Sequence, residues 1–418
     1  MLANLTTPLL GVVGTAVIGR LGEAHLLGAV ALSALVFDCI FWLFGFLRLS
    51  TVALTAQALG AGDAAEQRTV LARAFLIAGV IGLSLIALQV PLAALIYPAM
   101  GGSAAVTEAA QAYFFIRIWS APFVLANYTI LGWLIGLARA GTALGIQIAV
   151  NVLNMAITAT LVLAYDWGVA GAAMGALIAE SAGTALGLAV VALLSRGGRI
   201  ERAAVLDRNK LVRLLAINRD IMIRTAALIA AFLFFTAQGA RKGDTLLAAN
   251  AVLHNFTLIG AFFLDGFATA AEQLCGHSLG ARNRAAFARA VRLIVGWGFA
   301  FGVAATMAFF AFGGLLIDLM TASPEVREVA RTFMGLAALA PVAGVLAFAF
   351  DGIYVGATWT RDMRNLMLLS LAAFLAAWWL LTPLGNAGLW LSLLVFFVAR
   401  GALQGARYPA LLRATFRT

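Results

Sequence analysis

The sequence predicts an all-α membrane protein in which about twelve transmembrane helices form two pseudo-symmetric lobes of six helices each. Three observations support this fold class. The chain has 418 residues, of which 63% are hydrophobic and only 11% are charged, whereas a soluble domain needs about a quarter of its residues charged. Long apolar stretches follow one another along the whole chain, and basic residues are concentrated in one set of the loops between them.

The apolar stretches have the length that a membrane-spanning helix requires. About 20 residues cross the hydrocarbon as a helix, and a helix satisfies its own backbone hydrogen bonds where no water is present. The predicted stretches run over residues 2–20, 26–59, 70–97, 113–137, 140–164, 168–194, 221–240, 245–275, 290–318, 333–357, 366–384 and 387–404.

The loops between these stretches differ in charge. The loops after even-numbered stretches carry most of the 28 lysines and arginines, and the largest group lies within residues 195–224. Because cytoplasmic loops are enriched in basic residues, we expect a multi-pass protein of a bacterial inner membrane with both termini in the cytoplasm. The formal charge of +10 then reflects topology, and we expect no nucleic-acid partner.

The two halves of the chain share landmarks in the same order. One constant shift carries Ser103 onto Ser323 and Gly132 onto Gly352, together with the charged turns, the long helices and the proline-containing helices around them. An even number of helices per half gives both halves the same orientation in the membrane. Such a parallel repeat is typical of transporters with a cleft between two helical bundles.

These boundaries divide the chain into four parts. We expect an N-terminal six-helix lobe over residues 1–194 and a basic cytoplasmic connector over residues 195–220. A C-terminal six-helix lobe follows over residues 221–404, and residues 405–418 form a basic tail along the cytoplasmic surface.

Charged side chains within the spans are the main functional candidates, since each costs at least about 2.5–3.5 kcal/mol near the bilayer centre. Arginines occur within spans at Arg48 and Arg117. Burial disfavours the ionised form of a carboxyl group, so a buried acid can take up a proton near neutral pH and act in a proton relay. The candidate carboxylates are Asp38, Glu180, Asp265, Glu272 and Asp351.

Asp265 and Glu272 lie two helical turns apart on one face of the eighth stretch. One hypothesis is that Arg48, at the corresponding place in the first half, pairs with one of them across the cleft and acts as a latch. The alternative is a static ion pair within one half.

Glu180 lies on the sixth stretch, and Asn151 and Asn154 lie on its expected antiparallel neighbour. Together they predict a proton or cation site in the first half, while the alternative is that the amides only join helices. Asp38 lies about 18 Å along its helix, at mid-membrane depth. Asp351 is either a transport residue or a residue that orients the turn after it.

Other chemistries lack support in the sequence. The histidines His25, His254 and His277 share no metal-ligand spacing, so we expect no metal site. No nucleophile lies at a fixed spacing from a base, and we expect no enzymatic activity.

Four segments carry a resemblance to a known family, namely TTPLLGVVGTAVIGRLG (6–22), FWLFGFLRLSTVALTAQALGAGD (41–63), FFLDGFATAAEQLCGHSLGAR (262–282) and DGIYVGATWTRDMRN (351–365). In these segments, and in its spacing over nearly the whole chain, the sequence resembles the multidrug and toxic compound extrusion (MATE) family, in its DinF-like branch. The resemblance implies two six-helix lobes in a V and export of drugs or organic cations, driven by inward H⁺ or Na⁺.

The same resemblance implies a first-lobe site built from an aspartate on helix one, an asparagine on helix five and an acidic residue on helix six. Glu180 and either Asn151 or Asn154 match the last two, and Pro8 matches a proline at which helix one bends. The aspartate is replaced by Gly14.

This replacement leaves three alternatives. Glu180 carries the proton alone, which we favour; Asp38 compensates from helix two; or the protein is an uncoupled or weakly coupled relative. A lipid-linked precursor flippase of the same superfamily is a further alternative to an antiporter. We expect a small, cationic amphipathic substrate, no cofactor other than the coupling ion, and a monomer in the lipid bilayer.

Overall fold

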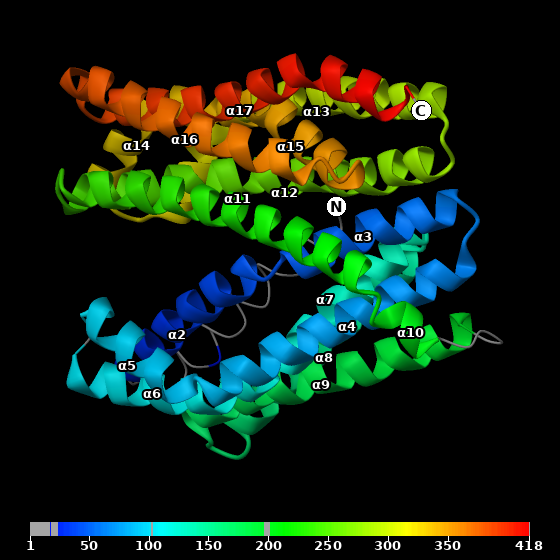
Figure 1. Ribbon diagram of the computed structural model, residues 1–418. Coiled ribbons are helices and arrows are strands. Elements are labelled where there is room, and N and C mark those ends of the chain that lie inside the picture. Colours follow the sequence, from blue (N-terminus) through cyan, green and yellow to red (C-terminus); the bar gives the residue numbers. More distant parts are fainter. Residues whose placement is uncertain (1–16, 18–23, 102, 196–200, 418) are drawn as a thin grey trace. The chain divides into compact units, whose positions relative to one another are not determined.

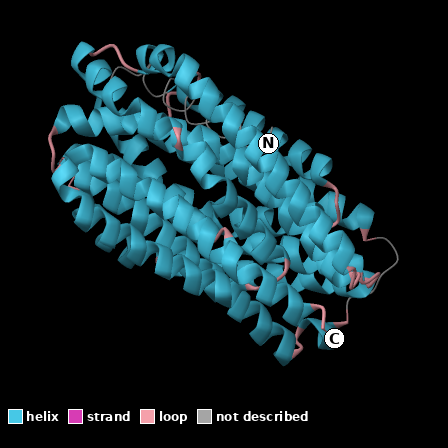
Figure 2. Cartoon of the chain, turned by 90° about the horizontal axis from the view of Figure 1, so that it is seen from above, coloured by secondary structure: helices cyan, strands magenta, loops and turns pink. Residues whose placement is uncertain are grey.

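The computed structural model describes Val17 and residues 24–101, 103–195 and 201–417. All regular secondary structure in these residues is helical (Figures 1 and 2), as predicted. Pro8 and Gly14 lie outside the described residues, and so does nearly all of the first predicted stretch, residues 2–20.

The helices follow one another with short connections. In chain order the elements are α2 (Ala24–Leu43), α3 (Phe46–Gly60), α4 (Ala64–Ala87), α5 (Gln89–Met100), α6 (Ala104–Arg117), the 3₁₀ turn η1 (Ile118–Ser120), α7 (Ala121–Gly136), α8 (Ala140–Leu163), α9 (Gly168–Leu194), α10 (Arg202–Val205), α11 (Arg208–Ala240), α12 (Asp244–Gly280), α13 (Arg284–Met320), α14 (Pro324–Ala338), α15 (Ala340–Gly356), α16 (Thr360–Leu381), the 3₁₀ turn η2 (Thr382–Leu384) and α17 (Gly385–Thr415).

Nine helical runs within the described residues are long and apolar enough to cross a membrane, and the bent pair α14–α15 makes ten if it forms one span. Every predicted stretch after the first overlaps one of these runs or the bent pair, and the predicted stretch 70–97 is divided between α4 and α5. The run Thr360–Thr415 is interrupted at η2, and its two helices α16 and α17 pack against each other. It therefore corresponds to the last two predicted stretches.

The chain divides into two compact units, and the boundary falls at Leu214 and Leu215, inside α11. The predicted connector, residues 195–220, is thus not a separate segment at its end, because α11 starts at Arg208 and continues into the first span of the second unit. Charge marks where a chain leaves lipid, but a helix continues readily into water, so the sequence pattern did not show that α11 begins within the predicted connector.

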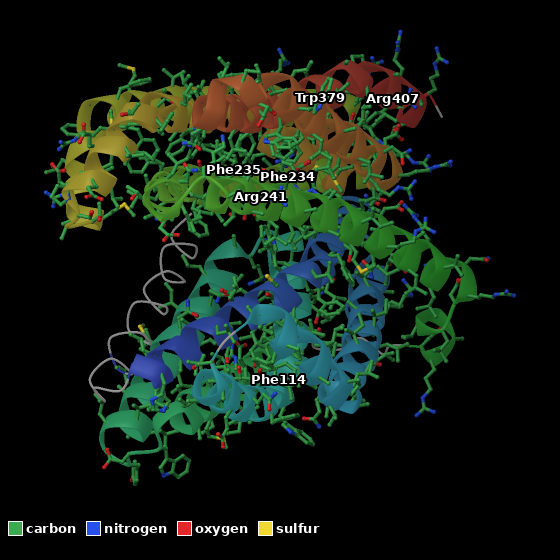
Figure 3. The ribbon with its side chains drawn as sticks, turned by 90° about the vertical axis from the view of Figure 1, so that its left-hand side faces the viewer. Phe114, Phe234, Phe235, Arg241, Trp379 and Arg407 are labelled. Atoms are coloured by element: carbon green, nitrogen blue, oxygen red, sulfur yellow. The ribbon has the colours of Figure 1, made fainter. Side chains whose placement is uncertain are left out.

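Each unit has its own apolar core. In the first unit Phe114 is fully buried against Phe37 and Tyr97. In the second unit the neighbouring residues Phe234 and Phe235, labelled in Figure 3, pack on Trp378 and Trp390, with ring centroids 4.9 Å apart in both pairs. Many large apolar side chains are nevertheless exposed in both units, as expected for helices whose outer faces contact lipid.

The predicted repeat is confirmed by the way in which equivalent helices cross. A Cβ atom on Gly132 would lie 2.6 Å from the carbonyl oxygen of Arg48, so α7 crosses α3 with direct backbone contact. The equivalent Gly352 of α15 lies in the same relation to Ala268 of α12, at 2.2 Å. Small residues at such crossings allow helix backbones to approach closely in lipid.

The turns of the two units are also equivalent. Ser103 accepts a hydrogen bond from the amide of Val106 and caps α6, and Ser323 accepts one from Val326 and caps α14. The left-handed residues Ala138 and Thr358, which follow the two crossing helices, are related by the same shift. The landmarks found in the sequence therefore correspond to turns of the same type in the two units.

The crossing at Gly352 makes a stability prediction. Gly352→Ala should lower the free energy of unfolding by about 1–3 kcal/mol, because the added methyl group overpacks the contact with the Ala268 backbone. Thermal unfolding of the purified protein in detergent measures this. Gly314→Ala is the matched control, since a Cβ there meets nothing within 4 Å. Equal unfolding temperatures for the two variants would contradict the close crossing.

Candidate functional site

The candidate site of the first unit is centred on Glu180 in α9. The Asn127 side chain of α7 donates a hydrogen bond from Nδ2 to Glu180 Oε2 at 2.8 Å, and the same amide lies 3.1 Å from the Glu180 backbone carbonyl. Thr184 Oγ1 lies 3.0 Å from Asn127 Oδ1 and donates to it, which orients the amide with its NH₂ group toward the carboxylate. Glu180 is thus held by a partner that the sequence analysis missed.

Arg117, the last residue of α6, is a positive charge that acts on this site. Its guanidinium lies within electrostatic range of both Glu180 and Asp38, the latter on α2. The group stacks over the Phe37 ring at 5.8 Å from the centroid, within the range of a cation–π contact. Arg117 Nε and Nη1 are buried and have no hydrogen-bond partner among the described residues.

Tyr128, next to Asn127, shows that these charges form one cluster. Its side chain interacts electrostatically with Glu180, Asp38 and Arg117, and also with Arg48. The residue Glu180 is half-buried and Asp38 is exposed. Two acids that the sequence analysis treated separately therefore share one cation.

Asn151 and Asn154 are buried on α8, which packs antiparallel to α9 as predicted. Gly175 faces Thr158 and Gly183 faces Val150, so Asn154 lies at the level of Glu180 along the helix pair. Asn154 Oδ1 accepts a hydrogen bond from Thr158 within α8 at 3.1 Å. Their part in ion coupling stays a prediction.

The second unit contains a buried polar cluster around Asp351 of α15. Its carboxylate binds Arg224 of α11 and the Nη2 atom of Arg400 in α17, and it accepts a hydrogen bond from Gln404 Nε2 at 2.9 Å. The Tyr354 hydroxyl donates to the Gln404 carbonyl oxygen at 2.7 Å. Asp351 thus joins three helices and does more than orient the turn that follows it.

The two clusters occupy equivalent places in the repeat but carry opposite charges. The shift that relates Gly132 to Gly352 also carries Glu180 onto Arg400 and Thr184 onto Gln404. The first unit has a carboxylate on this helix, whereas the second unit has the guanidinium of Arg400, which shares the Asp351 carboxylate with Arg224. That the carboxylate of the first unit binds a cation stays a prediction.

The remaining predicted residues lie on helices that cross near the glycines described above. The carbonyl of Arg48 on α3 faces Gly132, and the carbonyl of Glu272 on α12 faces Gly356. Asp265 lies on α12, where its carbonyl accepts the Thr269 hydroxyl at 2.9 Å. The predicted pairing of Arg48 with Asp265 or Glu272 joins residues from different units and stays a prediction.

The chain matches the model of a known protein family. The family model described as MatE matches residues 1–160 and 221–380, which is most of the chain and both halves of the repeat. The chain belongs to the MatE family. Members of this family are membrane transporters and not enzymes, so the chain is a multi-pass membrane transporter that handles small molecules.

Individual relatives of this MatE protein agree with the assignment. DNA damage-inducible protein F of Escherichia coli is 37% identical over 401 residues, which covers 96% of this chain and 87% of the relative. The probable multidrug resistance protein NorM of Caulobacter vibrioides is 28% identical over 380 residues, covering 84% and 77% of the two chains.

Solved structures show that the MatE fold extends over the full length. A crystal structure of a MATE protein in the straight conformation has a TM-score of 0.90 at 18% identity and covers 100% of this chain and 95% of that chain. The Vibrio cholerae MATE transporter VcmN in the bent form has a TM-score of 0.87 at 21% identity, with 99% and 94% covered.

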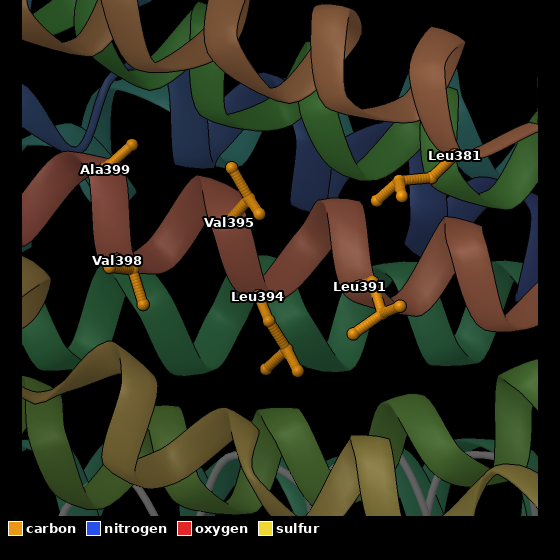
Figure 4. A pocket seen from close by; sticks show the side chains of 6 residues that line it. All are labelled: Leu381, Leu391, Leu394, Val395, Val398 and Ala399. Atoms are coloured by element: carbon orange, nitrogen blue, oxygen red, sulfur yellow. The ribbon is translucent and has the colours of Figure 1, made fainter.

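One cavity of this MatE transporter has no polar lining. An open hollow of about 430 Å³ lies along α17 and the end of α16, as Figure 4 shows, and it is lined by Leu381, Leu391, Leu394, Val395, Val398 and Ala399. No charged group is available there to select a cation. We assign this hollow to the surface that contacts lipid chains.

Proposed function

We propose that this transporter exports small, cationic amphipathic molecules by alternating access and that inward movement of H⁺ or Na⁺ drives the export. We further propose that it acts as a monomer in a bacterial inner membrane with both termini in the cytoplasm. Similarity to a probable multidrug resistance protein supports the class of substrate. The cluster of Asp38, Arg117, Asn127 and Glu180 is the observation that carries the proposal.

Charge balance explains how this cluster exchanges two kinds of cation. Arg117 balances part of the negative charge of Asp38 and Glu180, and Arg48 acts on the same cluster through Tyr128. A partly buried carboxylate is costly while it is ionised, and one monovalent cation bound at Glu180 would lower that cost by supplying a positive charge. A proton, a sodium ion and a cationic substrate can each supply that charge, so they compete for the same site.

Competition of this kind produces antiport when the two conformations bind the two cations differently. A ligand shifts a conformational equilibrium only by its difference in affinity for the two states. Protonation of Glu180 removes the counter-charge of the substrate and promotes its release. We propose that bending of helix one at Pro8 accompanies this step.

The glycine at position 14 limits the site to fewer acids than the resemblance implies. We propose that Glu180 carries the coupling ion, while Asn127, Asn151 and Asn154 supply amide groups around it and Asp38 supplies the second negative charge.

Reconstituted vesicles test the proposal. Vesicles loaded with a fluorescent cation should lose it when an inward pH gradient or an inward sodium gradient is imposed, and the effective gradient identifies the coupling ion. Vesicles without protein are the control. Equal efflux with and without both gradients would contradict coupling and would identify an uncoupled relative, whereas a channel would dissipate an ion gradient in the absence of substrate.

A further inference from the structure

A second charged site lies at the end of the first unit where α10 packs on α4 (Figure 1). Glu66, in the first turn of α4, binds Arg73 Nη1 at 2.8 Å and Lys210 Nζ at 2.6 Å. Arg73 Nη2 also donates to the carbonyl oxygen of Ala204 in α10 at 2.6 Å. One carboxylate and one arginine thus attach the basic connector to the first unit.

Glu66, Arg73 and Lys210 line a small cavity of about 70 Å³, whose other lining residues are Leu54, Val70, Arg213 and Leu214. Three cationic side chains in the lining, those of Arg73, Lys210 and Arg213, face the single carboxylate of Glu66. The cavity therefore has an excess of positive charge after the internal ion pairs are formed.

The partners of Arg73 within the described residues do not satisfy all of its hydrogen-bond donors. Arg73 is only 3% exposed, and its Nε atom is buried without a hydrogen-bond partner in the part of the chain that the structure describes. An unsatisfied buried donor on a charged group is costly, and an anion at this place would both accept the hydrogen bond and balance the excess charge.

The size and the donors of the cavity select one chemical class. A water molecule occupies about 30 Å³ in the liquid, so the cavity holds a group of a few heavy atoms. Guanidinium groups match the geometry of phosphate oxygens, and lysine adds a point charge. The remaining lining side chains are leucine and valine, which offer no further polar group to select a ligand.

We propose that this cavity binds a phosphate group, supplied either by an anionic lipid headgroup or by free inorganic phosphate. Basic pockets between transmembrane helices commonly bind lipid headgroups. The bound phosphate bridges α4 and the start of α11 through Arg73, Lys210 and Arg213, and it strengthens the attachment of the connector to the first unit.

Thermal unfolding of the purified full-length protein tests this site with two probes. Inorganic phosphate is titrated in detergent, and in a second arm the protein is placed in vesicles of phosphatidylglycerol or of phosphatidylcholine. Arg213→Gln removes an exposed cavity residue and should not disturb folding. Arg208→Gln makes the same charge change on the same helix, at an exposed residue that does not line the cavity.

The wild type and Arg208→Gln should be stabilised by the ligand, and Arg213→Gln should bind it about tenfold more weakly. Stabilisation by phosphate in detergent supports free phosphate as the source, and stabilisation only in phosphatidylglycerol supports a lipid headgroup. Equal responses of the two variants would overturn the proposal, since they would show a general charge effect. Absence of stabilisation by either probe would overturn it as well.

Discussion

Glu180→Gln is expected to reduce gradient-driven efflux to the level of vesicles without protein while leaving the fold intact. The glutamine has the same size and can still accept the hydrogen bond from Asn127, so the free energy of unfolding should change by less than about 1 kcal/mol. It cannot lose or gain a proton, and it has no charge with which to bind a cationic substrate. Efflux of a fluorescent cation and thermal unfolding are measured on the same preparation.

Glu108→Gln is the matched control for this experiment. Glu108 lies on α6 of the same unit and is exposed, and the variant makes the same chemical change outside the cluster. It should retain wild-type efflux. Full coupling in Glu180→Gln would transfer the coupling role to another acid, and Asp38 would then be the first candidate because it shares Arg117 with Glu180.

Asp351→Asn is expected to produce the largest loss of stability. The substitution leaves Arg224 and Arg400 buried side by side without a counter-charge. Breaking a buried ion pair by removal of one partner costs about 3–5 kcal/mol, since the remaining charge stays desolvated. The measurement is the unfolding midpoint of the purified protein in detergent.

Asp362→Asn provides the control for Asp351→Asn. Asp362 pairs with Arg407 at 2.9 Å, but both side chains are substantially exposed. Exposed pairs contribute about 0–1 kcal/mol, so this variant should unfold close to the wild type. If Asp351→Asn were as stable as Asp362→Asn, the cluster in the second unit would not depend on its carboxylate.

The sequence was a good guide to the fold for two physical reasons. Lipid requires long uninterrupted apolar helices, so hydropathy alone located the spans. Turns require particular residues, so the repeat could be recognised from the sequence by the capping residues Ser103 and Ser323. The start of α11 at Arg208 was not visible in the sequence, because the first residues of this helix are polar and resemble a loop between spans.

The sites were less predictable than the fold. The cost of a charge in lipid identified Glu180, Asp38 and Asp351 as candidates, but it said nothing about their partners. Asn127 and Arg117 lie on other helices than the acids they act on, and their proximity depends on how α6, α7 and α9 pack. Arg117 was visible as an arginine within a span, and that signal alone could have marked it for attention.

The opposite charges of the two polar clusters were also hidden in the sequence. Aligning the two halves on their glycines places Glu180 on Arg400. The difference in charge can be interpreted only when the hydrogen-bond partners of both side chains inside their units are known. It separates a site with a carboxylate on this helix from one in which two arginines share the carboxylate of Asp351.

The release of a bound cation when substrate binds tests the central claim, that Glu180 is the group at which substrate replaces the coupling ion. Purified protein in weakly buffered detergent solution is mixed with the cationic substrate, and released protons are followed with a pH indicator and released sodium by equilibrium dialysis. We predict that the wild type releases one of these ions and that Glu180→Gln releases none. Equal release from both proteins would contradict the claim.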